Sequence, residues 1–171
     1  MLIMNQSPLK KWPCGIIFVL LLIALCVFNI PIPIDRAVDA LEVDLDDDSH
    51  VVQRTVTLKG YYHINLFSSD SFSGIMTVSD YGFTDGSLTM QDLLVGDNTP
   101  IRYQTESSPG ELIYFGSLWS SRFLNDIMIW SYTDNEGNVL EDRTTADGIV
   151  IVSGVNSYEE AVQAFQDAFY D

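Results

Sequence analysis

Apolar and polar residues alternate from Val51 to Leu66, and this is the strongest pattern in the chain. The apolar positions share one face of an extended segment: Val52, Val56, Leu58, Tyr62, Ile64 and Leu66. A period of two predicts a strand with one buried face. Because these sixteen residues exceed the usual strand length, Gly60 in the middle predicts a bulge or a corner.

Shorter segments of the same character follow and are separated by turn residues. They predict further strands over 72–79, 87–95, 101–104, 111–119, 123–132 and 148–155. Segment 111–119 is apolar on both alternations, which indicates a strand buried on both faces. Asp134 to Asn138 has the composition of a hairpin turn.

The C-terminal segment changes to a helical period. Ser157 and Glu160 match a capping box at the start of a helix expected from about Tyr158 to Phe169. The apolar stripe of this helix consists of Tyr158, Val162, Phe165 and Phe169. We therefore expect a mainly β fold: a single antiparallel meander or small barrel-like sheet of six to eight strands, with one C-terminal amphipathic helix over a face or mouth.

Residues 12–34 carry no charge and directly follow Lys10 and Lys11, which predicts an N-terminal transmembrane helix. Pro31 and Pro33 remove backbone donors, so the regular helix is expected to end near Asn29 or Ile30.

The flanking charges predict the orientation of this span. Basic residues precede it and acidic residues follow it, so we expect 1–11 as a cytoplasmic tail and 12–34 in the lipid bilayer as an anchor or uncleaved signal. Residues 51–171 then form a domain outside the cell membrane.

A cleaved signal peptide is the alternative for the N-terminal segment. Val38, Asp39 and Ala40 offer small residues at suitable positions, and cleavage after Ala40 would secrete the domain. The apolar stretch is longer than the signal core of 7–15 residues that is usual, which favours the retained anchor.

Charge separates the two parts of the chain. Segment 35–171 holds all 24 acidic residues but only six of the eight basic ones, a formal charge of −18. Such a field disfavours binding to nucleic acid. Its first part, 35–50, is charged and poor in aromatic residues, which predicts an acidic, solvated linker with folding from about Val51.

Motifs that carry chemistry are missing from the sequence. Asp44, Asp46 and Asp48 match the start of a calcium loop, but Ser49 and Thr55 stand where the loop needs glycine and glutamate. The two histidines, His50 and His63, have no cysteine nearby, and no nucleotide loop or G-x-S-x-G motif occurs. We expect no metal, no cofactor and no enzymatic activity.

Aromatic side chains and scarce arginines are the remaining candidates for ligand binding. They are Tyr62, Tyr114, Trp119, Trp130, Arg102 and Arg122. Aromatic rings can line a cup, and an arginine can bind a ligand carboxylate, although both residue types are more often structural.

Three functions stay open. The first is a membrane-anchored, extracytoplasmic β module that binds or assembles with a protein partner or another surface or envelope component. The second is a small-molecule-binding β-barrel, and the third is an envelope hydrolase that needs a carboxylate pair or a Ser–His contact in a cleft.

Overall fold

The structure is a computed structural model that describes residues 15–20, 30–65, 68–85, 90–96, 98–104, 112–134, 136–138 and 148–170 of the 171-residue chain. From Ile30 onward the order of elements is β1 (Ile30–Asp44), β2 (Asp47–Ile64), β3 (Ser71–Val78), the 3-10 helix η2 (Gly82–Thr84), β4 (Met90–Leu94), β5 (Thr99–Gln104), β6 (Leu112–Ser120), the 3-10 helix η3 (Arg122–Leu124), β7 (Ile127–Ser131), β8 (Ile149–Ser153) and α2 (Tyr158–Tyr170).

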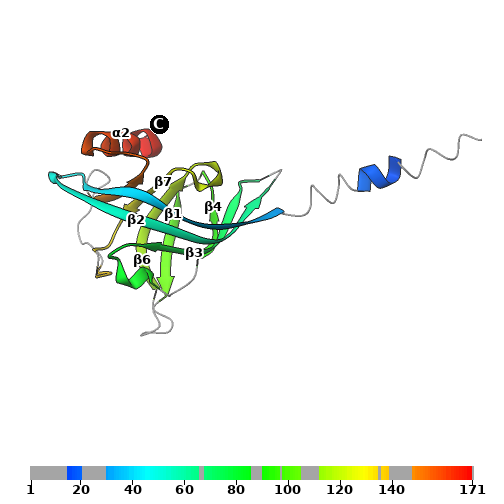
Figure 1. Cartoon of the computed structure of the whole chain (residues 1–171), viewed down its shortest axis with the longest axis horizontal. Coiled ribbons are helices and arrows are strands. Elements are labelled where there is room, and N and C mark those ends of the chain that lie inside the picture. The colour runs from blue at the N-terminus through cyan, green and yellow to red at the C-terminus, as the bar shows by residue number, and fades with distance from the viewer. Residues whose placement is uncertain are drawn as a thin grey trace, which may run out of the picture.

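The eight strands form one antiparallel sheet in the order β4-β3-β2-β1-β8-β7-β6-β5. The sheet curls until its end strands, β4 and β5, lie close to each other, which makes a nearly closed barrel (Figure 1). β4 and β5 are the two remaining edges, with no ladder between them in the described residues. They are joined by a short turn, where the Thr99 hydroxyl donates to the Leu94 carbonyl at 3.2 Å. The expected barrel-like sheet with a C-terminal helix is confirmed.

The acidic linker predicted for 35–50 is corrected by the structure. These residues form most of β1 and the start of β2, so the sheet begins at Ile30 rather than near Val51. Exposed and partly buried residues alternate along β1 despite its charges. Asp35 and Asp39 point to solvent, whereas Val38 is partly buried on the other face. Strand β1 is therefore central to the fold.

Gly60 does not form the predicted bulge. The register runs unbroken through Gly60, which pairs with Ile34 on β1 and Gly74 on β3. A Cβ built on Gly60 would lie 2.6 Å from the Cα of Gly74, so the two glycines let β2 and β3 approach closely.

The barrel interior is filled by large side chains. The predicted apolar face of β2 points inward, as do Phe72, Met76 and Val78 of β3, and these residues pack with those of β5 to β8. Fully buried members include Val56, Leu58, Tyr62, Phe72, Met76, Ile101, Tyr103, Phe115 and Ile129. The hydroxyl of Tyr103 donates to the Met76 carbonyl at 2.7 Å, so its polar atom is satisfied.

A second apolar layer lies outside the barrel, between the sheet and α2. It contains Leu41 and Val43 of β1, Val150 and Val152 of β8, and Met128 of β7. Segment 111–119 is predicted to be buried on both faces, but only the C-terminal half of β6 is, and it is shared between the two layers. In the N-terminal half, Leu112 and Tyr114 are exposed.

Helix α2 begins as predicted, but its buried stripe differs. The Glu160 backbone N–H donates to Ser157 Oγ at 3.3 Å, while the Glu160 carboxylate accepts from the Asn156 backbone at 2.8 Å. Ala161 and Phe165 are the buried residues, with Tyr158, Ala164 and Ala168 beside them. Val162 is only half-buried, and the side chain of Phe169 lies outside the described part.

The predicted anchor over 12–34 lies largely outside the described residues. A helix is described over 15–20, and strand β1 takes over from Ile30. Within the described parts of the chain, no helix has the length and apolar character needed to cross a membrane.

Candidate functional site

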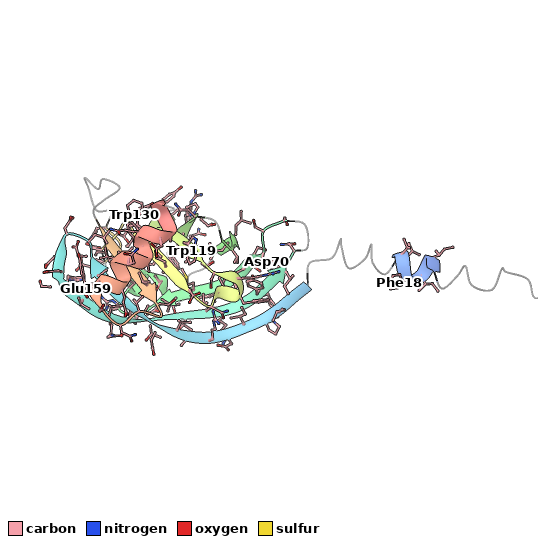
Figure 2. The ribbon with its side chains drawn as sticks, turned by 90° about the horizontal axis from the view of Figure 1, so that it is seen from above. Phe18, Asp70, Trp119, Trp130 and Glu159 are labelled. Carbon is pink, nitrogen blue, oxygen red and sulfur yellow. The ribbon has the colours of Figure 1, made fainter. Side chains whose placement is uncertain are left out.

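A groove of about 360 Å³ lies outside the barrel, between the C-terminal half of α2 and strands β6 to β8. The residue sizes on the helix explain it. Phe165 fills the space above the sheet, whereas Ala164 and Ala168 leave the neighbouring space open above Trp119 and Met128. Figure 2 shows Trp119 beside α2, which crosses the strands. A volume of this size falls at the lower end of the ~300–1,000 Å³ range of ligand pockets.

The groove is mostly apolar but carries two carboxylates. Asp126 belongs to the turn before β7, and Asp167 belongs to α2. Gly154, with φ +76°, borders the same space, and a Cβ there would lie 3.9 Å from Asp126 Oδ1. This arrangement suits a ligand with an apolar body and a positive charge.

Trp130 lies under α2 but does not line the groove. Its ring packs edge-on against Phe165, with 5.5 Å between ring centroids, and against Tyr132 at 5.6 Å. Trp130 therefore holds the helix on the sheet, whereas Trp119 faces the open space.

A buried ion pair closes the barrel at the end where β1 turns into β2. Glu42 is 2% exposed and accepts from Arg54 Nε at 2.7 Å and from Arg54 Nη2 at 3.2 Å. The hydroxyl of Tyr81 donates to the same carboxylate at 3.0 Å, and His50 Nε2 lies 3.0 Å from it. Arg54 also pairs with the exposed Asp80.

These partners decide the charge of Glu42. Burial raises the pKa of Glu42, but hydrogen bonds from Arg54, His50 and Tyr81 together outweigh burial and hold that pKa below its ordinary value. The carboxylate is therefore ionised and saturated with donors, which is the arrangement of a structural ion pair.

A second buried carboxylate closes the opposite end, near the start of β1 (Figure 2). Asp70 is 7% exposed and accepts from Tyr62 Oη at 2.8 Å, from Arg122 Nε at 3.0 Å and from the Asn65 backbone at 2.8 Å. Burial raises the pKa of Asp70, and the hydrogen bonds from Asn65, Tyr62 and Arg122 lower it further than burial raises it. The Tyr62 hydroxyl in turn accepts from the Phe123 N–H at 3.1 Å.

This second network fixes an unusual backbone. Phe123 has φ +62° and Leu124 has φ +56°, backbone conformations that residues other than glycine rarely adopt. The Phe123 ring stacks on Tyr62 with 5.1 Å between centroids. Strand β7 begins only at Ile127 because of this turn, although the sequence predicts a strand from Phe123.

Arg102 and Tyr114 lie together on the exposed surface of β5 and β6. The guanidinium carbon of Arg102 stands 4.6 Å from the centre of the Tyr114 ring. Both residues are exposed, and the contact is a cation–π interaction between two neighbouring strands of the sheet.

The six predicted site residues are thus divided among four places. Tyr62 and Arg122 meet at Asp70, and Arg102 meets Tyr114. Trp119 lines the groove, while Trp130 packs against α2.

The groove residues Asp126, Asp167, Ala164 and Ala168 were missed by sequence reasoning. Small residues four apart on α2 are the one signal that points to them.

One Ser–His contact is present, on the outside of the barrel. His63 Nε2 lies 2.9 Å from Ser73 Oγ, across β2 and β3. No carboxylate of the described residues bonds the other ring nitrogen. The face is also the convex surface of the sheet rather than a cleft, so the pair lacks the third group and the enclosure that hydrolysis needs.

Metal ligation has no support in the described part of the chain, where no three His, Cys, Asp or Glu side chains converge. Asp44 and Asp47 instead hold the β1–β2 turn, accepting from the backbones of Asp46 at 3.0 Å and Ser49 at 2.9 Å.

Comparisons with protein-family models, curated proteins and solved structures found no match to the chain. Function is therefore inferred from the geometry alone.

Proposed function

We propose that the chain is a membrane-anchored, extracytoplasmic β module that binds a component at the membrane surface without catalysing a reaction, and that the groove beneath α2 is its binding site. The observation that carries this proposal is the position of the groove. The barrel interior is filled by side chains, whereas the groove lies outside the barrel on an accessible face.

The filled interior favours this proposal over a small-molecule barrel. Tyr62, Phe72, Tyr103 and Phe115 occupy the space that an interior ligand would need. The buried Glu42–Arg54 pair lies at one end, and the buried Asp70 carboxylate, paired with the exposed Arg122, lies at the other. A ligand entering from either end would have to break one of them.

Strand β1 supports the retained anchor over the cleaved form. Ala40, after which cleavage would occur, pairs with Arg54 of β2 and Ser153 of β8 and is 3% exposed. Cleavage there would remove Ile30 to Ala40, a large part of a central strand. With β1 starting at Ile30, the span is confined to Trp12 to Asn29, eighteen residues, which reach ~27 Å as a helix.

Topology is tested first. A C-terminal epitope tag on the full chain should be removed by protease added to intact cells, while a cytoplasmic marker stays protected. The mature chain should also retain residues before Leu41. A protected tag, or a mature N terminus at Leu41, contradicts the anchored extracytoplasmic module.

Binding is tested by a photocrosslinking amino acid placed at Trp119, with the exposed Tyr61 of β2 as the matched control position. We expect position 119 to crosslink one discrete membrane-surface component and position 61 to give none. Equal crosslinking at both positions, or none at 119, contradicts the assignment of the groove.

A further inference from the structure

The two carboxylates of the groove come from opposite walls. Asp126 is held by the sheet side, where its backbone N–H donates to Ser121 Oγ at 2.9 Å. Asp167 is held by α2, where it accepts from Gln163 at 2.6 Å. A cation in the groove therefore has an acceptor on each side.

No described basic side chain of this chain neutralises them. Arg54 pairs with Glu42 and Asp80, Arg122 with Asp70, and Lys59 with Asp35. Arg36 donates to Asn125, and Arg102 lies over Tyr114. Within the described residues, neither groove carboxylate has an ion-pair partner, and both are exposed, so each can accept from a cation of a partner.

The C-terminal end of α2 adds to the negative potential of the groove. α2 has Glu159 and Glu160 in its first turn but no basic residue in its last turn. The carbonyl end of a helix carries a partial negative charge, and that end lies over the groove, where Ala164 and Ala168 line it.

The apolar walls restrict the class of ligand. Lysine and arginine bury their aliphatic stems while keeping the charged head at polar groups, and an indole such as Trp119 attracts a cation to its face. A phospholipid headgroup or a nucleotide would bring a phosphate next to two carboxylates, which is unfavourable.

We propose that the groove receives one basic side chain, a lysine or arginine flanked by apolar residues, from a protein partner. This rests on the proposed function of the domain as a binding module. The stem lies against Trp119 and Met128, and the charged head lies between Asp126 and Asp167.

The test uses the full chain in nanodiscs of zwitterionic lipid. The probe is a fluorescent, acetylated and amidated peptide of sequence Ala-Leu-Arg-Leu-Ala, compared with the same peptide carrying neutral citrulline for arginine. Fluorescence anisotropy should show that citrulline weakens binding about tenfold, as loss of a charge-assisted bond does. Raising the salt should weaken the arginine peptide and leave the citrulline peptide little changed.

Variants assign the binding to the groove. Asp126→Asn with Asp167→Asn should weaken the arginine peptide about tenfold, and Ala168→Phe should abolish binding by filling the space. Asp48→Asn with Asp85→Asn removes the same charge from exposed positions outside the groove and should change affinity less than about twofold. Unaltered circular dichroism shows that each variant is folded.

The proposal is overturned if the arginine peptide does not bind, if the citrulline peptide binds equally well, or if the two aspartate pairs have equal effects. Tighter binding of a small amine such as 4-phenylbutylamine also overturns it and assigns the groove to a small molecule. Failure here leaves the crosslink at Trp119 and the protease result intact, so it is distinguishable from failure of the proposed function.

Discussion

Arg54 binds Glu42 through two nitrogens inside the barrel end, with Nε 2.7 Å from Oε2 and Nη2 3.2 Å from Oε1. Both side chains are almost completely removed from solvent. Buried charges are stable only as a pair, because either one alone would lack the interaction that offsets its loss of hydration. The pair therefore joins β1 to β2 and, through Tyr81, to the segment after β3.

Removing one partner of this pair should be far worse than removing both. Arg54→Met leaves the Glu42 carboxylate buried without its guanidinium and should lower the free energy of unfolding by about 3–5 kcal/mol. The double variant Glu42→Leu/Arg54→Met should be more stable than Arg54→Met alone. Urea unfolding followed by tryptophan fluorescence measures both, and a double variant less stable than the single one contradicts the prediction.

Acid should unfold the domain through its two buried carboxylates. The pKa of Glu42 and that of Asp70 are lowered in the folded chain, so each contributes stability that is present above its ordinary value of 4.5 or 3.8 and is lost as the pH falls below it. The groups facing Glu42 are Arg54, His50 and Tyr81.

The check is the urea midpoint measured from pH 7 to pH 3. We expect little change at first and a steep fall below about pH 4.5. In Glu42→Gln the fall should be shallower and should begin lower, because Asp70 is then the remaining buried carboxylate with a lowered pKa. An identical pH profile in both proteins would show that Glu42 is not the titrating group.

The hydroxyl of Tyr62 should stabilise the turn at Phe123 and Leu124. Tyr62→Phe leaves the ring stacking but removes the hydrogen bonds to Asp70 and to the Phe123 N–H, with an expected loss of about 1–3 kcal/mol. Amide hydrogen exchange at 122–124 should accelerate. Tyr61→Phe, at the exposed neighbour, is the control and should be neutral within about 0.5 kcal/mol.

A methyl group at Gly60 should separate β2 from β3. Gly60→Ala puts a Cβ against the backbone of Ser73 and Gly74, and the resulting shift should destabilise the chain by about 1–3 kcal/mol. Gly82→Ala is the matched control, because a Cβ there meets nothing within 4 Å. Equal thermal midpoints for the two variants would contradict the close approach.

Most of the sheet was predictable because one face of each strand is buried. Val56, Leu58 and Tyr62 alternate with polar residues for that reason. The pairing of β1 with β8 joins strands far apart in the chain, and local turn signals do not predict it. Strand β1 was missed because acidic residues occupy its solvent face, and Glu42 stands at a buried position. Because of these acidic residues, the sequence does not reveal the alternation of exposed and buried positions that β1 has in the structure.

The groove was not predictable, because it depends on which helical residues face which strands. Ala164 and Ala168 look like ordinary helix formers in the sequence, and only the placement of Phe165 turns their small size into a hollow. Val162 was assigned to the buried stripe of α2 because residues three or four apart can form either of two neighbouring helix faces. The face that contains Ala161 and Phe165 is the buried one. The aromatic candidates were scattered for a similar reason: Tyr62 points into the barrel and Tyr114 away from it.

The position of β1 has a mechanical consequence. Its pairs with β2 extend from Ile30 to Asp44, and its last residues also pair with β8. A pull on the N-terminal segment acts along this strand, which β2 holds over its whole length and β8 holds from Ala40 to Asp44. The strand nearest the proposed anchor therefore transmits such a pull to both halves of the sheet.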